Sequence, residues 1–230
     1  MSKLTGEKMN AIEIAKLIDH TLLKPDATRE DVYRLCYEAV EYGFFAVCVN
    51  SVMAGVAAKA LEGTGIITCS VAGFPFGAQP AKAKAYEAAR ALEMGAGEID
   101  MVMNIGAAKE GDWDLVREDI AAVVGAVKGA GVKVILENCL LTDMEKVKAC
   151  IEAMHAGACF VKTSTGFSKG GATLEDVKLM RKTVGENMGV KAAGGIRDYA
   201  TAMAMIKAGA NRLGTSAGVA IIRGALESGD

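Results

Sequence analysis

The chain has 230 residues, a formal net charge of −2 at pH 7, and 51% apolar residues. That length fits one α/β domain or two small ones, and the near balance of charge argues against binding to nucleic acid or to an anionic membrane surface. No run of about 18 apolar residues occurs, which argues against a membrane-spanning helix, and the first twenty residues lack the apolar core of a signal peptide.

The cysteines are spread along the chain without any CxxC pair: Cys36, Cys48, Cys69, Cys139, Cys150 and Cys159. In a chain of this size without a signal segment, such spacing is typical of reduced thiols that act as small apolar residues. We therefore expect a cytoplasmic protein.

Short segments rich in β-forming residues alternate with longer alanine-rich segments along the whole chain. The strands expected, in chain order, span residues 18–22, 44–50, 66–71, 98–104, 132–138, 159–164, 190–193 and 211–215. Helical segments such as residues 80–94 and 142–155 lie between them, and Thr142 with Glu145 forms a predicted capping box. Glycine-containing turns (EYG, MGAG, KGAG, HAGA, KAGA) end five helices just before a strand.

This alternation predicts a parallel sheet covered by helices on both faces. About eight βα units in this length favour a (β/α)8 TIM barrel near its lower size limit. No polar linker interrupts the rhythm, so we expect a single catalytic domain over residues 1–230 with a short N-terminal helical extension. An open, doubly wound sheet is the alternative.

A lysine stands inside each of two successive strands, Lys162 in CFVKTS and Lys191 in GVKAAGG. Neighbouring strands lie about 4.8 Å apart, so two inward lysines would approach to roughly 5–6 Å. Like charges at that distance repel by about 3 kcal/mol, and desolvation also disfavours the charged form. One lysine would then be a neutral amine, able to attack a carbonyl. The alternative is two unrelated strand lysines, with Lys162 extending to solvent.

Other polar groups also stand at predicted strand ends, where such barrels place the active site. Asp100, in EIDMVMN, either holds a lysine in place or takes part in proton transfer, and both interpretations place it near Lys191. The glycine-rich turns AAGGIRD and LGTSAG follow the seventh and eighth strands, where barrels often bind phosphate through backbone N–H groups. Each could instead be an ordinary turn.

Several other motifs favour structural roles. GTSAG fits a nucleophile elbow, but both histidines, His20 and His155, precede the serine, and their spacing does not suit zinc. We expect His20 to be structural, His155 to lie at a helix end, and Cys48 to pack in the core. Lys133 starts its strand, at or beyond the margin of the active end.

Eight stretches in order along the chain resemble the deoxyribose-phosphate aldolase family: IDHTLLKP, AVCVN, AGFPFG, EIDMVMNIG, VKVILE, FVKTSTGF, VKAAGGIRD and RLGTSAG. The resemblance implies a TIM-barrel class I aldolase that uses no metal or cofactor. It would reversibly cleave 2-deoxy-D-ribose 5-phosphate to D-glyceraldehyde 3-phosphate and acetaldehyde. It also implies a homodimer or homotetramer whose partner is a small phosphosugar, with no nucleic-acid or membrane partner.

Residue by residue, the resemblance implies that Lys162 forms the Schiff base and that Lys191 favours the neutral form of Lys162. It also implies that Asp100 works with Lys191 in proton transfer. The implied phosphate-binding residues are Gly166, Gly194, Gly195, Ile196, Arg197, Gly214 and Ser216, and the supporting ones are Asp19, Thr21 and Lys133. Phe167 and Ala217 depart from members with a lysine and a second serine there. The final GALESGD also lacks the terminal tyrosine of some members.

Two rival functions share part of this pattern. Another phosphosugar barrel, such as a keto-acid aldolase or an isomerase, would have the phosphate-binding turns without the paired lysines. A phosphate-metabolite binding protein would need the glycines and no amine.

Overall fold

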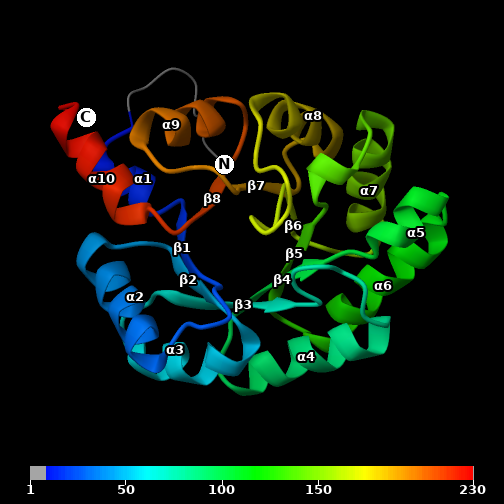
Figure 1. The fold of residues 1–230 in the computed structure, drawn as a ribbon, viewed down its shortest axis with the longest axis horizontal. Helices are drawn as coiled ribbons and strands as arrows, with labels where there is room; N and C mark the ends of the chain where they lie inside the picture. Colours follow the sequence, from blue (N-terminus) through cyan, green and yellow to red (C-terminus); the bar gives the residue numbers. More distant parts are fainter. Residues whose placement is uncertain (1–8, 230) are drawn as a thin grey trace.

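The computed structural model describes residues 9–229. Residues 1–8, which belong to the segment without an expected signal peptide, lie outside the described residues. Eight parallel strands form a closed barrel in chain order (Figure 1). They are β1 (Ile18–Leu22), β2 (Ala46–Val49), β3 (Ile67–Ala72), β4 (Glu98–Val102), β5 (Gly131–Ile135), β6 (Phe160–Lys162), β7 (Gly189–Ala193) and β8 (Arg212–Thr215). Because β1 pairs with β8, the TIM barrel is confirmed and the open sheet is excluded.

Helices surround the barrel on its outer face (Figure 1). They are α1 (Ala11–Ala15), α2 (Arg29–Tyr42), α3 (Ala54–Ala60), α4 (Ala81–Glu93), α5 (Ile105–Glu110), α6 (Trp113–Ala126), α7 (Asp143–His155), α8 (Leu174–Val184), α9 (Tyr199–Lys207) and α10 (Gly218–Glu227), with the 3₁₀ turns η1 (Ser51–Met53) and η2 (Asn138–Leu140). The short α1 before β1 is the expected N-terminal extension. No helix within residues 9–229 has the length and apolarity needed to cross a membrane.

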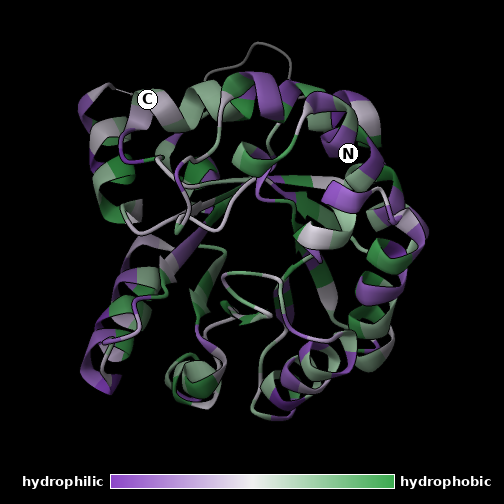
Figure 2. Cartoon of the chain, turned by 45° about the vertical axis from the view of Figure 1, so that its right-hand side comes forward, coloured by the Kyte–Doolittle hydropathy of each residue, from purple (hydrophilic) through white to green (hydrophobic). Residues whose placement is uncertain are grey.

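The strands are buried along most of their length because both of their faces are covered. Every residue of β2 and of β7 is buried, with one face toward the helices and the other inside the barrel. The surrounding helices alternate hydrophobic and hydrophilic residues (Figure 2), as helices do when one side faces a core. Charged residues within such strands therefore lie inside the barrel or under a helix.

Three strands end two or three residues earlier than the sequence predicts. The predicted strands 98–104, 132–138 and 159–164 end at Val102, Ile135 and Lys162. Beyond these points single backbone bonds remain, such as Leu136 N to the Lys162 carbonyl at 3.0 Å. The first residues past the regular ladder, Met103, Leu136 and Thr163, are still fully buried.

The predicted capping box of α7 is confirmed. Thr142 Oγ1 accepts from the backbone N of Glu145, and the Glu145 carboxylate accepts from the backbone N of Thr142 at 2.7 Å. His155 is the last residue of this helix, and its side chain is 58% exposed. Its place at the helix end agrees with the expectation from the sequence.

A buried ion pair between α4 and α6 fastens the end of β4. Lys84 Nζ donates to Asp119 Oδ2 at 2.8 Å and to the carbonyl of Val102 at 2.9 Å. Asp119 Oδ2 also accepts from the backbone N of Asn104 at 3.0 Å. The pair therefore joins two helices to the segment that leaves the barrel strand containing Asp100.

Replacing Lys84 with methionine is expected to lower the free energy of unfolding by about 3–5 kcal/mol, because the Asp119 carboxylate would stay buried without its partner. Urea denaturation measures the change. The matched control is Lys109→Met, which breaks an ion pair with Glu145 whose lysine is 46% exposed and is expected to cost about 0–1 kcal/mol. Equal losses in the two variants would contradict the structural role of the buried pair.

Candidate active site

A cluster of charged side chains occupies the interior of the barrel. Its members come from six strands and none is more than 8% exposed: Asp19, Glu98, Asp100, Lys133, Lys162, Lys191 and Arg212. Alternate residues of a strand point to the same face, and parallel neighbours in register place their side chains side by side. Lys162 is paired in register with Lys191, and Lys191 with Arg212.

Asp100 joins three lysines. Its Oδ2 accepts from Lys162 Nζ and from Lys191 Nζ, each at 2.7 Å, and its Oδ1 accepts from Lys133 Nζ at 2.9 Å. The nitrogens of Lys162 and Lys191 are thus no farther apart than twice 2.7 Å. The structure brings the two strand lysines together, with a shared carboxylate oxygen between them.

Asp19 and Arg212 complete the cluster on the side of β1 and β8. Lys191 Nζ donates to Asp19 Oδ2, and Arg212 donates to Asp19 Oδ1 at 3.0 Å and to Glu98 Oε2 at 3.1 Å. The guanidinium group of Arg212 also lies 3.6 Å from the ring centroid of Phe45, at cation–π distance. Asp19 therefore accepts hydrogen bonds from two cationic side chains, with Lys133 Nζ also 3.8 Å from its Oδ2, and Lys191 has two carboxylate partners.

These contacts set the protonation states. Burial alone would raise the pKa of Asp100, but Lys133, Lys162 and Lys191 outweigh it and hold that pKa well below 3.8. Burial alone would lower the pKa of Lys191, but Asp100 and Asp19 raise it above 10.5. At neutral pH Asp100 is a carboxylate and Lys191 is an ammonium ion.

Lys133 lies deeper in the site than its position in the strand suggests. It is fully buried, and its Nζ is 2.7 Å from Glu98 Oε2 as well as bonded to Asp100. The expectation from its strand position, at or beyond the margin of the active end, was wrong, and Lys133 lies near the site as the resemblance implies. Lys133 is paired in register with Asp100 across β4 and β5, which places their side chains next to each other.

The two neighbours of Asp19 in β1 differ in role. Thr21, which is partly buried, donates its hydroxyl to the carbonyl of Asp19 at 2.8 Å. His20 is buried, and its Nε2 lies 2.7 Å from Glu38 Oε2 of α2. Burial lowers the pKa of His20 despite this contact. His20 thus contacts the helix layer, as its expected structural role requires.

The three predicted phosphate turns meet at the C-terminal end of β6 to β8. Gly166, Gly194 and Gly195 have φ values of 84°, 87° and 83°, which glycine adopts without strain. A Cβ on Gly194 would lie 3.0 Å from the Cα of Gly171 and 3.6 Å from that of Gly166. The loops after β6 and β7 therefore approach too closely for a side chain at residue 194.

The loop after β8 adjoins the loop after β7. The hydroxyl of Thr215 donates to the carbonyl of Ile196 at 2.7 Å. Gly214 is buried, and a Cβ there would lie 3.0 Å from Lys191 Cε. Arg197 and Ser216 are exposed. The predicted phosphate-binding residues thus lie together on one side of the barrel mouth, after β6, β7 and β8 and next to Lys191.

Two cavities lie at this end of the barrel. One of about 520 Å³ has Thr21 and Ser216 in its wall, together with the start of α2. The other, of about 100 Å³, is bounded by the loops after β3 to β6, including Glu137, Thr165 and Phe167. The larger cavity therefore brings two predicted site residues, Thr21 and Ser216, to one space.

Sequence reasoning missed Glu98, Arg212 and Cys69. Glu98 precedes Asp100 by two residues in EIDMV, so the period of a strand could have placed both carboxylates on one face. Arg212 is the first residue of a buried strand, where an unpaired charge would be costly. Nothing in the sequence marks Cys69, since its contact with Asp100 depends on how β3 and β4 are paired.

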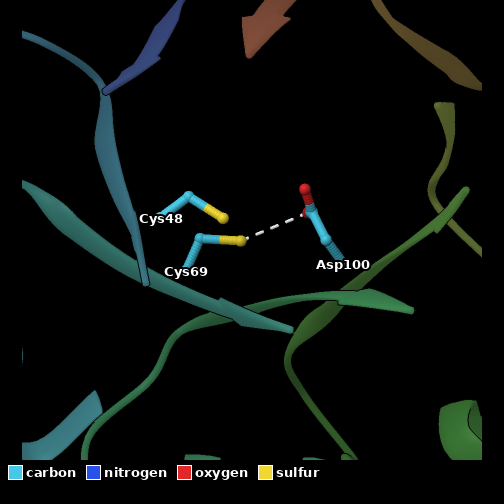
Figure 3. A group of neighbouring side chains, drawn as sticks. All are labelled: Cys48, Cys69 and Asp100. Carbon is cyan, nitrogen blue, oxygen red and sulfur yellow. Dashed lines mark hydrogen bonds between the residues drawn. The ribbon is translucent and has the colours of Figure 1, made fainter. Parts of the chain in front are cut away.

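Figure 3 shows Cys48, Cys69 and Asp100 together, with possible ligand atoms within 4.8 Å of one another. The Cys69 thiol donates to Asp100 Oδ1 at 3.2 Å. Burial and the neighbouring Cys48 and Asp100 raise the pKa of Cys69 well above 9.0, whereas metals bind the thiolate. Asp100 already accepts hydrogen bonds from the Nζ atoms of three lysines, so Cys48, Cys69 and Asp100 do not suit a cation.

The chain was compared with known proteins. The DeoC/LacD family aldolase model matches residues 13–227. The deoxyribose-phosphate aldolase of Clostridium tetani is 60% identical over 92% of this chain and 98% of its own length, and that of Thermococcus gammatolerans is 59% identical over 94% and 98%. The tetrameric deoxyribose phosphate aldolase from Aeropyrum pernix superposes with a TM-score of 0.89 at 36% identity, covering 96% of this chain and 93% of that one. Fold, interior lysines and these matches agree, and the chain belongs to the DeoC/LacD family of aldolases.

Proposed function

We propose that this protein is a class I aldolase that reversibly cleaves 2-deoxy-D-ribose 5-phosphate to D-glyceraldehyde 3-phosphate and acetaldehyde through a Schiff base on Lys162. The observation that carries the proposal is the shared Asp100 oxygen between Lys162 and Lys191, each 2.7 Å away. The named activity of relatives at 58–60% identity over more than nine-tenths of the chain supports the substrate.

The charge count of the interior cluster favours one neutral lysine. Within residues 9–229 the cluster holds four cationic side chains and three carboxylates: Lys133, Lys162, Lys191 and Arg212 against Asp19, Glu98 and Asp100. A buried surplus charge is costly, so loss of one proton makes the cluster neutral. Arginine keeps its proton, which leaves the choice among the lysines.

The three lysines of the cluster differ in the number of their carboxylate partners. Lys191 is bonded to Asp19 and Asp100, and Lys133 to Glu98 and Asp100. Lys162 has one carboxylate partner, Asp100. The lysine with the fewest anionic partners is the one whose ammonium form is stabilised least, so Lys162 supplies the neutral amine that attacks a carbonyl.

The reaction follows from this arrangement. The Lys162 amine adds to the C1 aldehyde of the open-chain sugar, and loss of water gives an iminium. The C2–C3 bond then breaks and its electron pair moves toward the iminium nitrogen. The C3 hydroxyl gives its proton through water to the Asp100 carboxylate, which works with the adjacent Lys191 ammonium group, and D-glyceraldehyde 3-phosphate is released. The same pair returns a proton to C2 of the resulting enamine. Hydrolysis of the new iminium releases acetaldehyde and the free amine.

Borohydride reduction in the presence of acetaldehyde tests the proposal. The expected result is a covalent adduct that mass spectrometry maps to Lys162 and that a chelator leaves unchanged. An isomerase or a phosphate-metabolite binding protein would give no adduct. Absence of the Lys162 adduct would therefore contradict the aldolase.

Binding of the substrate phosphate is assigned to the turns after β6, β7 and β8. Replacing Ser216 with alanine is expected to raise KM for 2-deoxy-D-ribose 5-phosphate about 10-fold with little change in kcat, because one hydrogen bond to a charged group is lost. Steady-state kinetics with unphosphorylated 2-deoxyribose should be unaffected. Ser228→Ala, at the end of α10, is the control. Equal losses on both sugars would contradict a phosphate contact.

The proposal includes the state of the whole protein. It is a single catalytic domain over residues 1–230, located in the cytoplasm, that acts on a small phosphosugar and binds neither nucleic acid nor membrane. It assembles as a homodimer or homotetramer, which the tetrameric structure of the Aeropyrum pernix relative supports. Light scattering after size-exclusion chromatography measures the assembly.

A further inference from the structure

Glu137 has an unusual backbone conformation directly after β5. Its φ of 58° and ψ of 61° are left-handed, and it is the one non-glycine residue with positive φ within residues 9–229. Side chains with a Cβ rarely adopt this region, and such residues persist where the surrounding structure holds them, often at functional sites. The contacts of Glu137 identify what holds it.

The Glu137 side chain crosses to the loop that follows Lys162. Glu137 is 2% exposed, its Oε1 accepts from the backbone N of Thr165 at 3.3 Å, and its Oε2 accepts from the Thr165 hydroxyl. The same hydroxyl oxygen accepts from the backbone N of Phe167 at 3.0 Å. No lysine or arginine among residues 9–229 forms an ion pair with Glu137, so its buried carboxylate is satisfied by this loop.

The backbone on both sides of Glu137 also binds the chain that contains Lys162. Leu136 N donates to the carbonyl of Lys162 at 3.0 Å, and Asn138 N donates to that of Thr163 at 2.9 Å. The left-handed residue between them turns its carboxylate toward Thr165. Residues 136–138 therefore hold the start of the β6–α8 loop by four hydrogen bonds, two of them from one side chain.

The segment held in this way carries a predicted phosphate contact. Gly166 follows Thr165 directly and lies against Gly194 of the next turn. Gly166 has no side chain of its own to fix its position, and a loop that must become ordered on binding weakens affinity. A loop already held at Thr165 does not have to become ordered on binding, so no affinity is lost in this way. This effect needs no contact between Glu137 and the reacting atoms.

We propose that Glu137 is a positioning residue that, through Thr165, holds Gly166 in place for the phosphorylated end of the substrate. The inference rests on the proposed function. The loop after β6 then acts in substrate affinity, while Schiff-base formation on Lys162 depends on the interior charges. A buried carboxylate outside the charged cluster thereby belongs to substrate recognition.

The test uses Glu137→Gly, which removes the carboxylate in a conformation that glycine tolerates, and Thr165→Val, which removes the hydroxyl with little change of shape. Each is expected to raise KM for 2-deoxy-D-ribose 5-phosphate about 10-fold, with kcat changed less than about 3-fold. Glu137→Gln, which keeps an acceptor for the Thr165 amide, is expected to retain most of the affinity. The rate of borohydride trapping with acetaldehyde should stay at the wild-type level in all three.

The double variant Glu137→Gly with Thr165→Val separates positioning from two independent effects. If the two residues act through one contact, its KM matches that of the single variants, whereas independent effects multiply. A wild-type KM in both single variants, multiplied effects in the double variant, or a parallel loss of trapping would overturn the inference. Wild-type protein that forms no adduct would instead contradict the proposed function.

Discussion

Replacing Lys162 with methionine is expected to abolish the acetaldehyde adduct and to lower kcat/KM for 2-deoxy-D-ribose 5-phosphate on the order of 10⁴-fold or more, as loss of a covalent nucleophile does. No other amine takes over, because Lys191 is held as an ammonium ion by Asp19 and Asp100. The variant should fold, since three cationic and three anionic side chains remain in the interior cluster. Mass spectrometry after reduction and steady-state kinetics measure the two losses.

The control for this variant is Lys169→Met. Lys169 is an exposed lysine in the same loop, and its replacement should leave both adduct and turnover at the wild-type level. An adduct of undiminished yield on another lysine of Lys162→Met would show that the nucleophile has been misassigned.

Replacing Lys191 with leucine is expected to lower kcat/KM about 10²- to 10⁴-fold, as loss of a proton-transfer group does. It should also move the pH of half-maximal trapping upward by roughly two units. Without Lys191, three cationic and three anionic groups remain in the cluster, so the surplus charge that favours a neutral amine is gone. Trapping rates from pH 6 to pH 10 measure the shift.

Lys148→Leu, at an exposed position of α7, is the matched control and should leave the profile in place. An unchanged pH profile in the Lys191 variant would remove the argument from the charge pair. If turnover is lost while the pH dependence of trapping stays the same, Lys191 acts in proton transfer and does not set the charge of Lys162.

Much of the barrel could be predicted because its signals are local. A buried parallel strand appears in the sequence as a short apolar run, and the helix before it often ends in glycine. These two signals predict the order of the elements. Strand ends were less accurate. The residues after Val102 and Ile135 stay buried outside the regular ladder, and composition does not distinguish the two environments.

The candidate site could be predicted in part for the same reason. Lys162, Lys191 and Asp100 stand out as charges within apolar strands. Lys133 was placed too far from the site because its depth depends on the register between β4 and β5. The left-handed conformation of Glu137 had no sequence signal, since glycine or asparagine is the residue that usually marks it.

The sequence is enough to predict repeated βα units and the amines of Lys162 and Lys191 within two strands. Which carboxylate each amine meets depends on the tertiary structure. Arg212 and Asp19 are 193 positions apart, and they touch because β8 pairs with β1 when the barrel closes. Alternation along a strand determines which face a side chain occupies, but its partner across the interior depends on strand register and closure, which long-range packing sets.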